Sequence, residues 1–281
     1  MMEINLQNPF GAPVFFMETV SSTMDACRNL AADSAAHGTV VFADFQESGR
    51  GRRNRLWETR KGTSLMFTIF LDYPDFEAMP KALTLKAGLA AVSAIEDIIP
   101  AFGGLTQVKW PNDILLLSKK ISGILVETEL SPGLINDKKN NTRVFIGMGV
   151  NILQEDFPRD LQHKAGSFVS VFREKFPGSS IPSFFYAKDT RAQLLQRILF
   201  FLKRELDINV DSPNQELSWK NRLGKRLYKR GEQVIFANGA AGSRELIHGR
   251  LENIGEDGEL LIIPQGGTQA RPFINGELQV Y

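Results

Sequence analysis

A short glycine-containing segment, GRGRRNRLWETR from Gly49 to Arg60, carries an unusual density of arginines. They are Arg50, Arg52, Arg53, Arg55 and Arg60. Guanidinium groups this close repel one another unless anions lie among them, and their planar forks suit phosphate and carboxylate oxygens. Gly49 and Gly51 leave the backbone free to adopt positive φ and to close over a ligand. We call this segment the Arg loop, and its composition predicts an anion site that becomes ordered when it is filled.

A basic segment is also typical of a solvated surface turn or a nucleic-acid contact. The flanking residues favour a small-molecule site. Residues 39–46 and 64–71 are rich in β-branched and aromatic side chains and predict two strands, which would tether the loop across a sheet edge or face. Trp57 within the loop is a packing residue or a lid that closes onto a base or an apolar ligand surface.

A second group of polar residues stands in VKWPNDI, residues 108–114. Lys109 ends an otherwise apolar strand, where a charge needs an anion or a carboxylate nearby. Pro111 cannot continue the ladder, so Asn112 and Asp113 fall in a loop at the sheet edge. An ordinary turn would also explain these residues. Asp113 could otherwise supply a Mg²⁺ ligand or pair with a ligand hydroxyl.

Glycines interrupt two further apolar strands. Gly123 follows Lys120 in KISGILVE, and Gly147 and Gly149 lie in IGMGVN. Such glycines weaken a strand unless something packs against the bare backbone. A buried flat ligand would explain them, and so would a strand crossing.

The composition restricts the function classes. The 281 residues carry a formal net charge of +1 and are 43% hydrophobic, which argues against a dedicated nucleic-acid binder and allows a large core. No transmembrane stretch or signal pattern is visible, so we expect a cytoplasmic protein without membrane contact. Cys27 falls on one face of a predicted helix and is expected to be a buried apolar residue. The three histidines are far apart, and no metal cluster or Cys/His pair is predicted.

The periodicity predicts an α+β protein with a mixed, mostly antiparallel sheet and helices on one face. The first dozen residues are expected to be a loose lead-in, 131–142 a polar turn, and 154–182 mostly irregular. We expect strands over 13–20, 39–46, 64–71, 106–110, 114–117, 120–130 and 144–153, and helices over 21–36, 80–99 and 187–206. Short strands after residue 226 predict a small β-barrel. The predicted domains are therefore 1–225, catalytic, and 226–281, the barrel.

The motifs together resemble the biotin–protein ligase family. SST (21–23), FQESGRGRRNRLW (45–57), VKWPNDI (108–114), KKISGILVE (119–127) and IGMGVNI (146–152) come in that family's order and at similar spacing. The resemblance covers Val14 to Asn151 strongly and the C-terminal strands more weakly. It implies a class II synthetase-like catalytic domain followed by an SH3-like β-barrel.

The resemblance also implies a two-step reaction. Biotin and MgATP would give biotinyl-5′-adenylate and pyrophosphate, and the acyl group would pass to a lysine of a biotin carboxyl carrier domain, as in acetyl-CoA carboxylase. ATP and Mg²⁺ would be co-substrates, biotin a substrate, and no cofactor would be permanently bound. The protein would be a monomer or a homodimer and would bind no nucleic acid.

The family pattern implies roles for individual residues. Arg50, Arg52, Lys109 and Lys120 would be catalytic, and Asp113 would bind Mg²⁺. The residues around biotin would be Ser22, Thr23, Met24, Gln46, Gly49, Arg50, Gly51, Arg52, Lys120, Gly123 and Gly147. The residues around ATP or the adenylate would be Arg53, Arg55, Trp57, Lys109, Asn112, Asp113 and Asn151.

The chain departs from the family pattern in places. Ser48 and Asn54 stand where Ala and Gly are common, and Asn54 would tolerate positive φ in the loop. The chain starts only about a dozen residues before the first catalytic strand, so we expect no helix-turn-helix domain and no operator binding. A lipoate or octanoate ligase or transferase of the same fold is the alternative enzyme. A nucleic-acid-binding module that uses the Arg loop is the alternative from another class.

Overall fold

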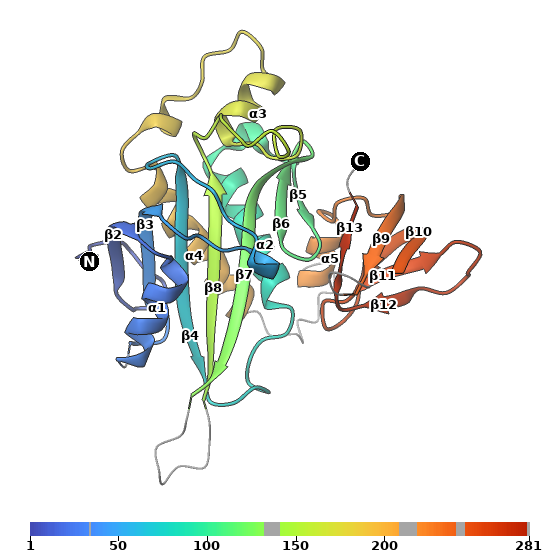
Figure 1. The fold of residues 1–281 in the computed structure, drawn as a ribbon, viewed down its shortest axis with the longest axis horizontal. Coiled ribbons are helices and arrows are strands. Elements are labelled where there is room, and N and C mark those ends of the chain that lie inside the picture. Colours follow the sequence, from blue (N-terminus) through green and yellow to red (C-terminus); the bar gives the residue numbers. More distant parts are fainter. Residues whose placement is uncertain (34, 132–140, 208–217, 240–244, 280–281) are drawn as a thin grey trace.

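The protein is described here by a computed structural model that covers residues 1–33, 35–131, 141–207, 218–239 and 245–279 (Figure 1). Most of the predicted polar turn at 131–142 lies outside these residues. The described chain forms a large sheet, helices on both of its faces and a smaller sheet beside it.

The large sheet has eight strands in the order β1-β2-β3-β4-β8-β7-β6-β5. Only β2 and β3 pair in parallel, which confirms the mixed, mostly antiparallel class. The strands are β1 (Met2–Ile4), β2 (Val14–Val20), β3 (Val40–Gln46), β4 (Ser64–Tyr73), β5 (Thr106–Lys109), β6 (Asp113–Leu116), β7 (Lys119–Leu130) and β8 (Thr142–Asn151). The expected loose lead-in is wrong at β1, because Met2 pairs antiparallel with Phe16 of β2.

The prediction of helices on one face is correct for two helices and wrong for a third. Helix α2 (Leu83–Ile98) and helix α4 (Thr190–Asp207) share one core with the side chains of alternate strand residues. Helix α1 (Thr23–Ala32) packs on the opposite face, where Met24 and Cys27 meet Phe70 and Phe145. The side chains on both faces of the central strands are therefore buried. For this reason β4 is a nearly continuous run of apolar residues.

The ends of the helices differ from the sequence expectation. The Ser22 side chain accepts a hydrogen bond from Met24 N and caps α1. The helix ends at Ala32 rather than near residue 36. The stretch 154–182 contains helix α3 (Phe168–Lys175), which begins with a reciprocal Ser167–Ser170 capping box. Short elements are η1 (Arg52–Asn54), η2 (Pro100–Phe102), η3 (Ser183–Tyr186) and α5 (Trp219–Gly224).

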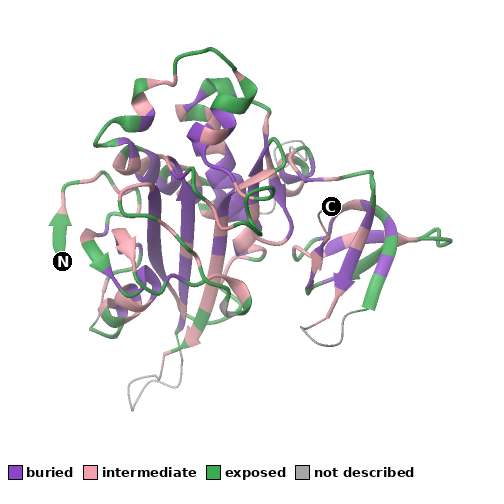
Figure 2. Ribbon diagram, turned by 45° about the horizontal axis from the view of Figure 1, so that its top comes forward, coloured by how far each residue is buried: buried purple, intermediate pink, exposed green. Residues whose placement is uncertain are grey.

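The C-terminal strands form a five-stranded antiparallel sheet that fits an SH3-like domain (Figure 2). In the order β12-β11-β10-β9-β13, its strands are β9 (Gln233–Asn238), β10 (Glu245–Ile254), β11 (Leu260–Pro264), β12 (Arg271–Phe273) and β13 (Gly276–Leu278). Trp110 joins this small sheet to the large one. Its ring packs 5.8 Å from Phe236, centroid to centroid, and its Nε1 donates to Gly258 O at 3.0 Å.

The Arg loop connects β3 to β4 across the face of the large sheet that carries α1 (Figure 1). It is closed at its base by two backbone hydrogen bonds, from Trp57 N to Gly49 O at 2.8 Å and from Gly51 N to Arg55 O at 2.7 Å. The loop therefore covers the sheet from α1 toward the small sheet, and it does not extend into solvent as a free tail.

Candidate functional site

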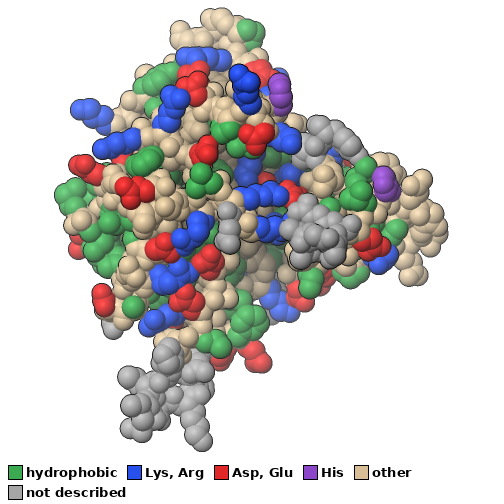
Figure 3. All heavy atoms as spheres, in the orientation of Figure 1, with side chains coloured by type: hydrophobic (Ala, Val, Ile, Leu, Met, Phe, Trp, Pro, Cys, Tyr) green, Lys and Arg blue, Asp and Glu red, His purple; other side chains and the backbone are tan. Residues whose placement is uncertain are grey.

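A cavity of about 540 Å³ lies under the Arg loop. Its walls come from the start of α1, the surfaces of β4, β7 and β8, the turn after β5, and β13 of the small sheet. Figure 3 shows Lys and Arg side chains gathered where the two sheets meet. The volume is in the range of small-molecule sites.

The cavity brings together nearly all the residues that the sequence singled out. They are Ser22, Thr23, Met24, Gln46, Arg50, Gly51, Arg52, Arg53, Arg55, Trp57, Lys109, Asn112, Asp113, Lys120, Gly123, Gly147 and Asn151. Gly49 does not line the cavity. A Cβ atom at Gly49 would lie 2.8 Å from Trp57 O and 2.9 Å from Gln46 Nε2, so this glycine closes the base of the loop instead.

One end of the cavity is neutral. Gln46 Oε1 accepts hydrogen bonds from Thr23 N at 2.8 Å and from Thr23 Oγ1 at 2.9 Å. The buried Thr68 donates from its Oγ1 to Thr23 Oγ1 at 3.0 Å. Hydroxyl and amide groups that bond one another are held in fixed directions before a ligand arrives, which suits recognition of a neutral polar group. We call Ser22, Thr23, Gln46 and Thr68 the neutral end.

Glycines shape the floor of the cavity. A Cβ at Gly147 would lie 2.9 Å from the terminal carbon of Met24, and a Cβ at Gly149 would lie 2.4 Å from the Trp57 indole. Trp57 can therefore lie flat against β8 only because that position has no side chain. The Trp57 Nε1 lies buried against Gly149 and has no hydrogen-bond partner among the described residues, so this donor is left without an acceptor.

The other end of the cavity is charged. Lys109 is only 9% exposed, and its burial lowers the pKa of its ammonium group, an effect that Asp113 opposes. Lys120 Nζ lies 2.7 Å from Asp113 Oδ1. That oxygen is buried and accepts no well-directed hydrogen bond in the described structure, so the contact is an ion pair rather than a good hydrogen bond.

Arg52 extends this charged end from the Arg loop. Its Nη1 donates to Asn112 Oδ1 at 3.2 Å, and Asn112 Nδ2 in turn donates to Ile124 O of β7 at 2.8 Å. Burial lowers the pKa of Arg52, and neighbouring Arg53 lowers it further. We call Arg52, Lys109, Asn112, Asp113 and Lys120 the charged end. Lys109 and Arg52 are desolvated and form no ion pair within 4.0 Å among the described residues, whereas Lys120 is 35% exposed and pairs with Asp113. Desolvated cations of this kind would bind a phosphate or carboxylate strongly.

The expectation that the arginines of the loop await an external anion is wrong for most of them, because protein carboxylates already pair with them. Arg50 pairs with Asp25, and Arg53 and Arg55 both pair with Glu277. Arg60 pairs with Asp156. Within the described residues, Arg52 alone of the five forms no ion pair within 4.0 Å. The guanidinium groups of the Arg loop therefore repel one another less than the composition of the loop suggests.

The Arg loop contains a residue in the left-handed region, Arg53, with φ 58° and ψ 34°. A non-glycine residue in this region is held by its surroundings. Arg53 Nη2 donates to Gly239 O at 3.1 Å, which is such a restraint.

Asn151 lines the cavity with an amide that the protein already uses. Its Nδ2 donates to Gly166 O at 3.1 Å, and its Oδ1 accepts from Ser64 Oγ at 3.4 Å. These bonds tie the end of β8 to the segment before α3. They leave Asn151 less free to turn toward a nucleotide than a solvated amide would be.

Sequence reasoning missed three residues that complete the site: Asp25, Thr68 and Glu277. Thr68 could have been found, because it is a polar residue within an apolar strand that is buried on both faces. Asp25 has the appearance of a favourable charge in the first turn of α1, and Glu277 is remote in sequence from the loop arginines with which it pairs. No local pattern reveals either role.

Cys27 takes no part in the site. It is fully buried in the α1 core, and desolvation raises the pKa of its thiol to about 12. A thiol in this state is inert as a nucleophile.

The sequence profile of the Biotin/lipoate A/B protein ligase family matches residues 16–151. The "Bifunctional ligase/repressor BirA" of Bacillus spizizenii is 32% identical over 264 residues, which cover 92% of this chain and 72% of that protein. The chain belongs to the biotin–protein ligase family.

Other relatives agree with this assignment. The "Biotin--[acetyl-CoA-carboxylase] ligase" of Mycobacterium tuberculosis is 27% identical over 55% of this chain and 53% of its own length. The biotin protein ligase of Aquifex aeolicus, solved in complex with biotin and ATP, has the same fold, with a TM-score of 0.66 over 95% of this chain and 97% of that one at 24% identity. The biotin protein ligase of Leishmania major in complex with biotin gives a TM-score of 0.59 at 25% identity, over 93% of this chain and 98% of that one.

Proposed function

We propose that this protein attaches biotin to a lysine of a biotin carboxyl carrier protein, with ATP as co-substrate and biotinyl-5′-adenylate as intermediate. One observation supports this best: a single cavity joins a preorganised neutral end to a desolvated cationic end beneath the Arg loop. The neutral end suits the uncharged ring system of biotin. The charged end suits the biotin carboxylate and the phosphates, which must meet for the first step.

The first step brings two anions together. The biotin carboxylate oxygen attacks the α-phosphorus of ATP, and the bond to the bridging oxygen breaks as pyrophosphate leaves. Lys120, Arg52 and Lys109 would offset the repulsion between the two anions and the charge that develops on the phosphate. Because these cations are fixed before the ligands bind, little reorganisation is needed during the reaction.

The second step needs no protein nucleophile. The acceptor amine attacks the acyl carbon of the mixed anhydride, AMP leaves with the bond electrons, and the amine loses a proton. Until then the anhydride must be kept from water. The Arg loop with Trp57 covers the cavity and would exclude water from it.

Magnesium is a further part of the proposal. The described residues contain no group of three or more His, Cys, Asp or Glu side chains that could hold a metal alone. Mg²⁺, however, often binds through one or two carboxylates and substrate phosphates. Asp113, whose buried Oδ1 lacks a well-directed hydrogen bond, fits such a role. A bound Mg²⁺ would neutralise phosphate charge at this end of the cavity.

The carrier domain of a carboxylase is the proposed partner, and acetyl-CoA carboxylase is the proposed carboxylase. The division into 1–225 and 226–281, a state of monomer or homodimer, the cytoplasmic location and the lack of DNA binding also stay predictions. Among the described helices, none has both the length and the apolar character needed to cross a bilayer.

The test is pyrophosphate release by the purified protein with biotin, lipoate or octanoate, followed by transfer to a carrier domain. We expect release and a biotinylated lysine with biotin only. Release with lipoate or octanoate alone would replace the proposal with the alternative enzyme. Salt-sensitive oligonucleotide binding without any response to biotin would favour the nucleic-acid module.

A further inference from the structure

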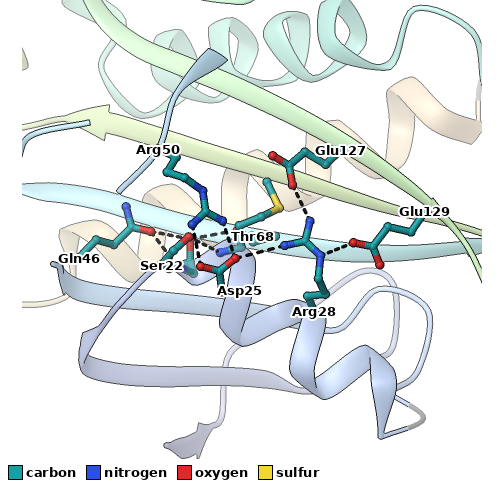
Figure 4. A network of polar contacts seen from close by, with 10 residues as sticks. Ser22, Asp25, Arg28, Gln46, Arg50, Thr68, Glu127 and Glu129 are labelled. Carbon is teal, nitrogen blue, oxygen red and sulfur yellow. Dashed lines mark hydrogen bonds and ion pairs between the residues drawn. The ribbon is translucent and has the colours of Figure 1, made fainter. Parts of the chain in front are cut away.

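The first end of the Arg loop is held by helix α1. Arg50 donates from Nη1 to Asp25 Oδ2 at 2.9 Å, and its Nη2 also bonds the Oδ1 of that carboxylate (Figure 4). Asp25 lies one turn into the helix whose N-terminus carries Ser22 and Thr23 of the neutral end. The contact therefore links the loop directly to the element that orients the neutral end.

Asp25 is itself held in place by a chain of charges. Arg28, one turn further along α1, donates to Asp25 Oδ1 at 3.2 Å. Arg28 also pairs with Glu127 at 2.5 Å and with Glu129, both on β7 (Figure 4). Three carboxylates thus surround two guanidinium groups, and Arg50 lowers the pKa of Asp25, so the carboxylate stays ionised. The chain runs from the sheet through the helix to the loop.

The second end of the Arg loop is held by the small sheet. Arg55 donates from Nη1 and Nη2 to the two carboxylate oxygens of Glu277 at 3.1 and 3.0 Å, a bidentate pair. Arg53 Nη1 lies 3.7 Å from the same carboxylate, and Arg53 also donates to Gly239 O. Glu277 stands on β13 and lines the cavity.

We propose that Asp25 and Glu277 are positioning residues that hold the two ends of the Arg loop closed over the cavity, so that Arg52 between them faces the reacting groups. What the closed loop retains, the adenylate, rests on the function proposed above. The inference assigns the small sheet a task in catalysis: through Glu277 it supplies one of the two anchors of the loop.

Two anchors are needed because each ion pair by itself stabilises the closed loop only weakly. The Asp25 and Arg50 side chains are 36% and 37% exposed, and Arg55 is 62% exposed. Exposed ion pairs contribute little singly and weaken with salt. A loop held at one end can swing about it, whereas a loop held at both ends cannot. We therefore expect loss of either anchor to open the loop and loss of both to open it further.

The first experiment uses the ligand-free full-length protein and is independent of biotin. Trypsin cleaves after arginine and lysine, so cleavage within residues 50–61, mapped by mass spectrometry, reports how often the loop opens. We expect Asp25→Asn and Glu277→Gln each to speed this cleavage about threefold or more, and the double variant to exceed both. Asp33→Asn, at the residue that follows α1, and Glu256→Gln beside the small sheet are matched controls, and they should cleave like wild type.

The second experiment measures the half-life of enzyme-bound adenylate. We expect it to fall by about threefold to tenfold in either anchor variant, and we expect pyrophosphate release in the first turnover to slow as well, because an open loop moves Arg52 away from the reacting groups. Exchanging the charges, Arg55→Glu with Glu277→Arg, should restore most of the half-life that each single substitution loses. A residue that merely stabilises the fold would not show this reciprocity.

The two experiments separate the possible failures. If wild type makes no adenylate from biotin, the proposed function fails, while the proteolysis still tests the anchors. If the anchor variants are cleaved no faster than the controls, the anchoring proposal is wrong. Faster cleavage with an unchanged adenylate half-life would overturn it too, because opening would then not release the intermediate.

Discussion

The two ends of the cavity reach their ligand-ready state in opposite ways. At the neutral end, the hydroxyl groups of Thr23 and Thr68 and the Gln46 amide oxygen bond one another in the absence of ligand. At the charged end, Lys109 is buried without an ion pair within 4.0 Å among the described residues. The first end is built from satisfied groups, and the second from charges that burial destabilises.

This difference indicates which groups of the cavity can stabilise the negative charge that develops during the reaction. A satisfied network can select a shape and a hydrogen-bond pattern, but it gains little when charge develops during a reaction. A desolvated cation gains most at that moment, because the developing negative charge offsets the cost of its burial. We therefore expect substitutions at the neutral end to act on the binding of biotin, and those at the charged end to act on the rate of adenylate formation and on the affinity for ATP.

The largest expected effect is that of Lys120→Ala. Removal of the cation beside Asp113 should slow adenylate formation by about 10²–10³-fold, as loss of a preorganised charge at a reaction centre usually does. Single-turnover pyrophosphate release measures it. Lys119→Ala is the control, since this neighbour does not line the cavity. Wild-type release by the Lys120 variant would remove this residue from the chemistry.

Thr68→Val tests the neutral end. The change keeps the shape of the side chain but removes the hydroxyl that donates to Thr23, and we expect biotin affinity to fall about tenfold (~1.4 kcal/mol) with little effect on ATP affinity. Calorimetric titration measures both. Thr142→Val is matched to it, because the buried Thr142 hydroxyl has no hydrogen-bond partner in the described structure. A larger loss for ATP than for biotin would reverse the assignment of the ends.

A pH series tests the charged end through Lys109. Its pKa is lowered by burial, so the ammonium loses its proton at a lower pH than an exposed lysine. ATP affinity should fall several-fold as the pH rises from about 7 to about 10, and Lys109→Arg should flatten that profile. Biotin affinity without nucleotide should vary less.

The lowered pKa of Lys109 predicts the opposite pH dependence for the free energy of unfolding. Between the lowered folded-state pKa of Lys109 and its unfolded-state value, the unfolded chain binds more protons than the folded one. This residue should therefore make the fold more stable as the pH rises through that window. Denaturant unfolding of wild type and Lys109→Met at several pH values measures it. Equal pH dependence in the two proteins would contradict the shift.

The smallest expected effects come from two neighbouring glycines of β8. Gly147→Ala should push Met24 aside and weaken biotin binding by about threefold, whereas Gly149→Ala should displace Trp57 and shorten adenylate retention by a similar factor. Each variant serves as the control for the other. If both act on the same step, the two ends are not separate.

The central strands were predictable from their nearly continuous apolar runs, and helices α2 and α4 from periodic apolar residues that face one core. The strands of β3, β4 and β8, and helices α2 and α4, all appear close to their predicted ranges. Two errors share one cause: the limits of β1 and α1 depend on contacts with other elements, the pairing of β1 with β2 and the packing of α1 on the central strands. Local sequence carries little information about such contacts.

The sequence by itself determined most of the cations and glycines that surround the cavity, because these residues are conspicuous beside strands that are otherwise apolar. Only the tertiary structure decided which of those cations remain available. Asp25 and Glu277, remote from the Arg loop in sequence, pair with Arg50 and Arg55, while Arg52 donates to the amide oxygen of Asn112 and forms no ion pair within the part of the chain that the structure describes. The physical reason is that a charge acts over the few ångströms around it, and folding alone determines what occupies that space.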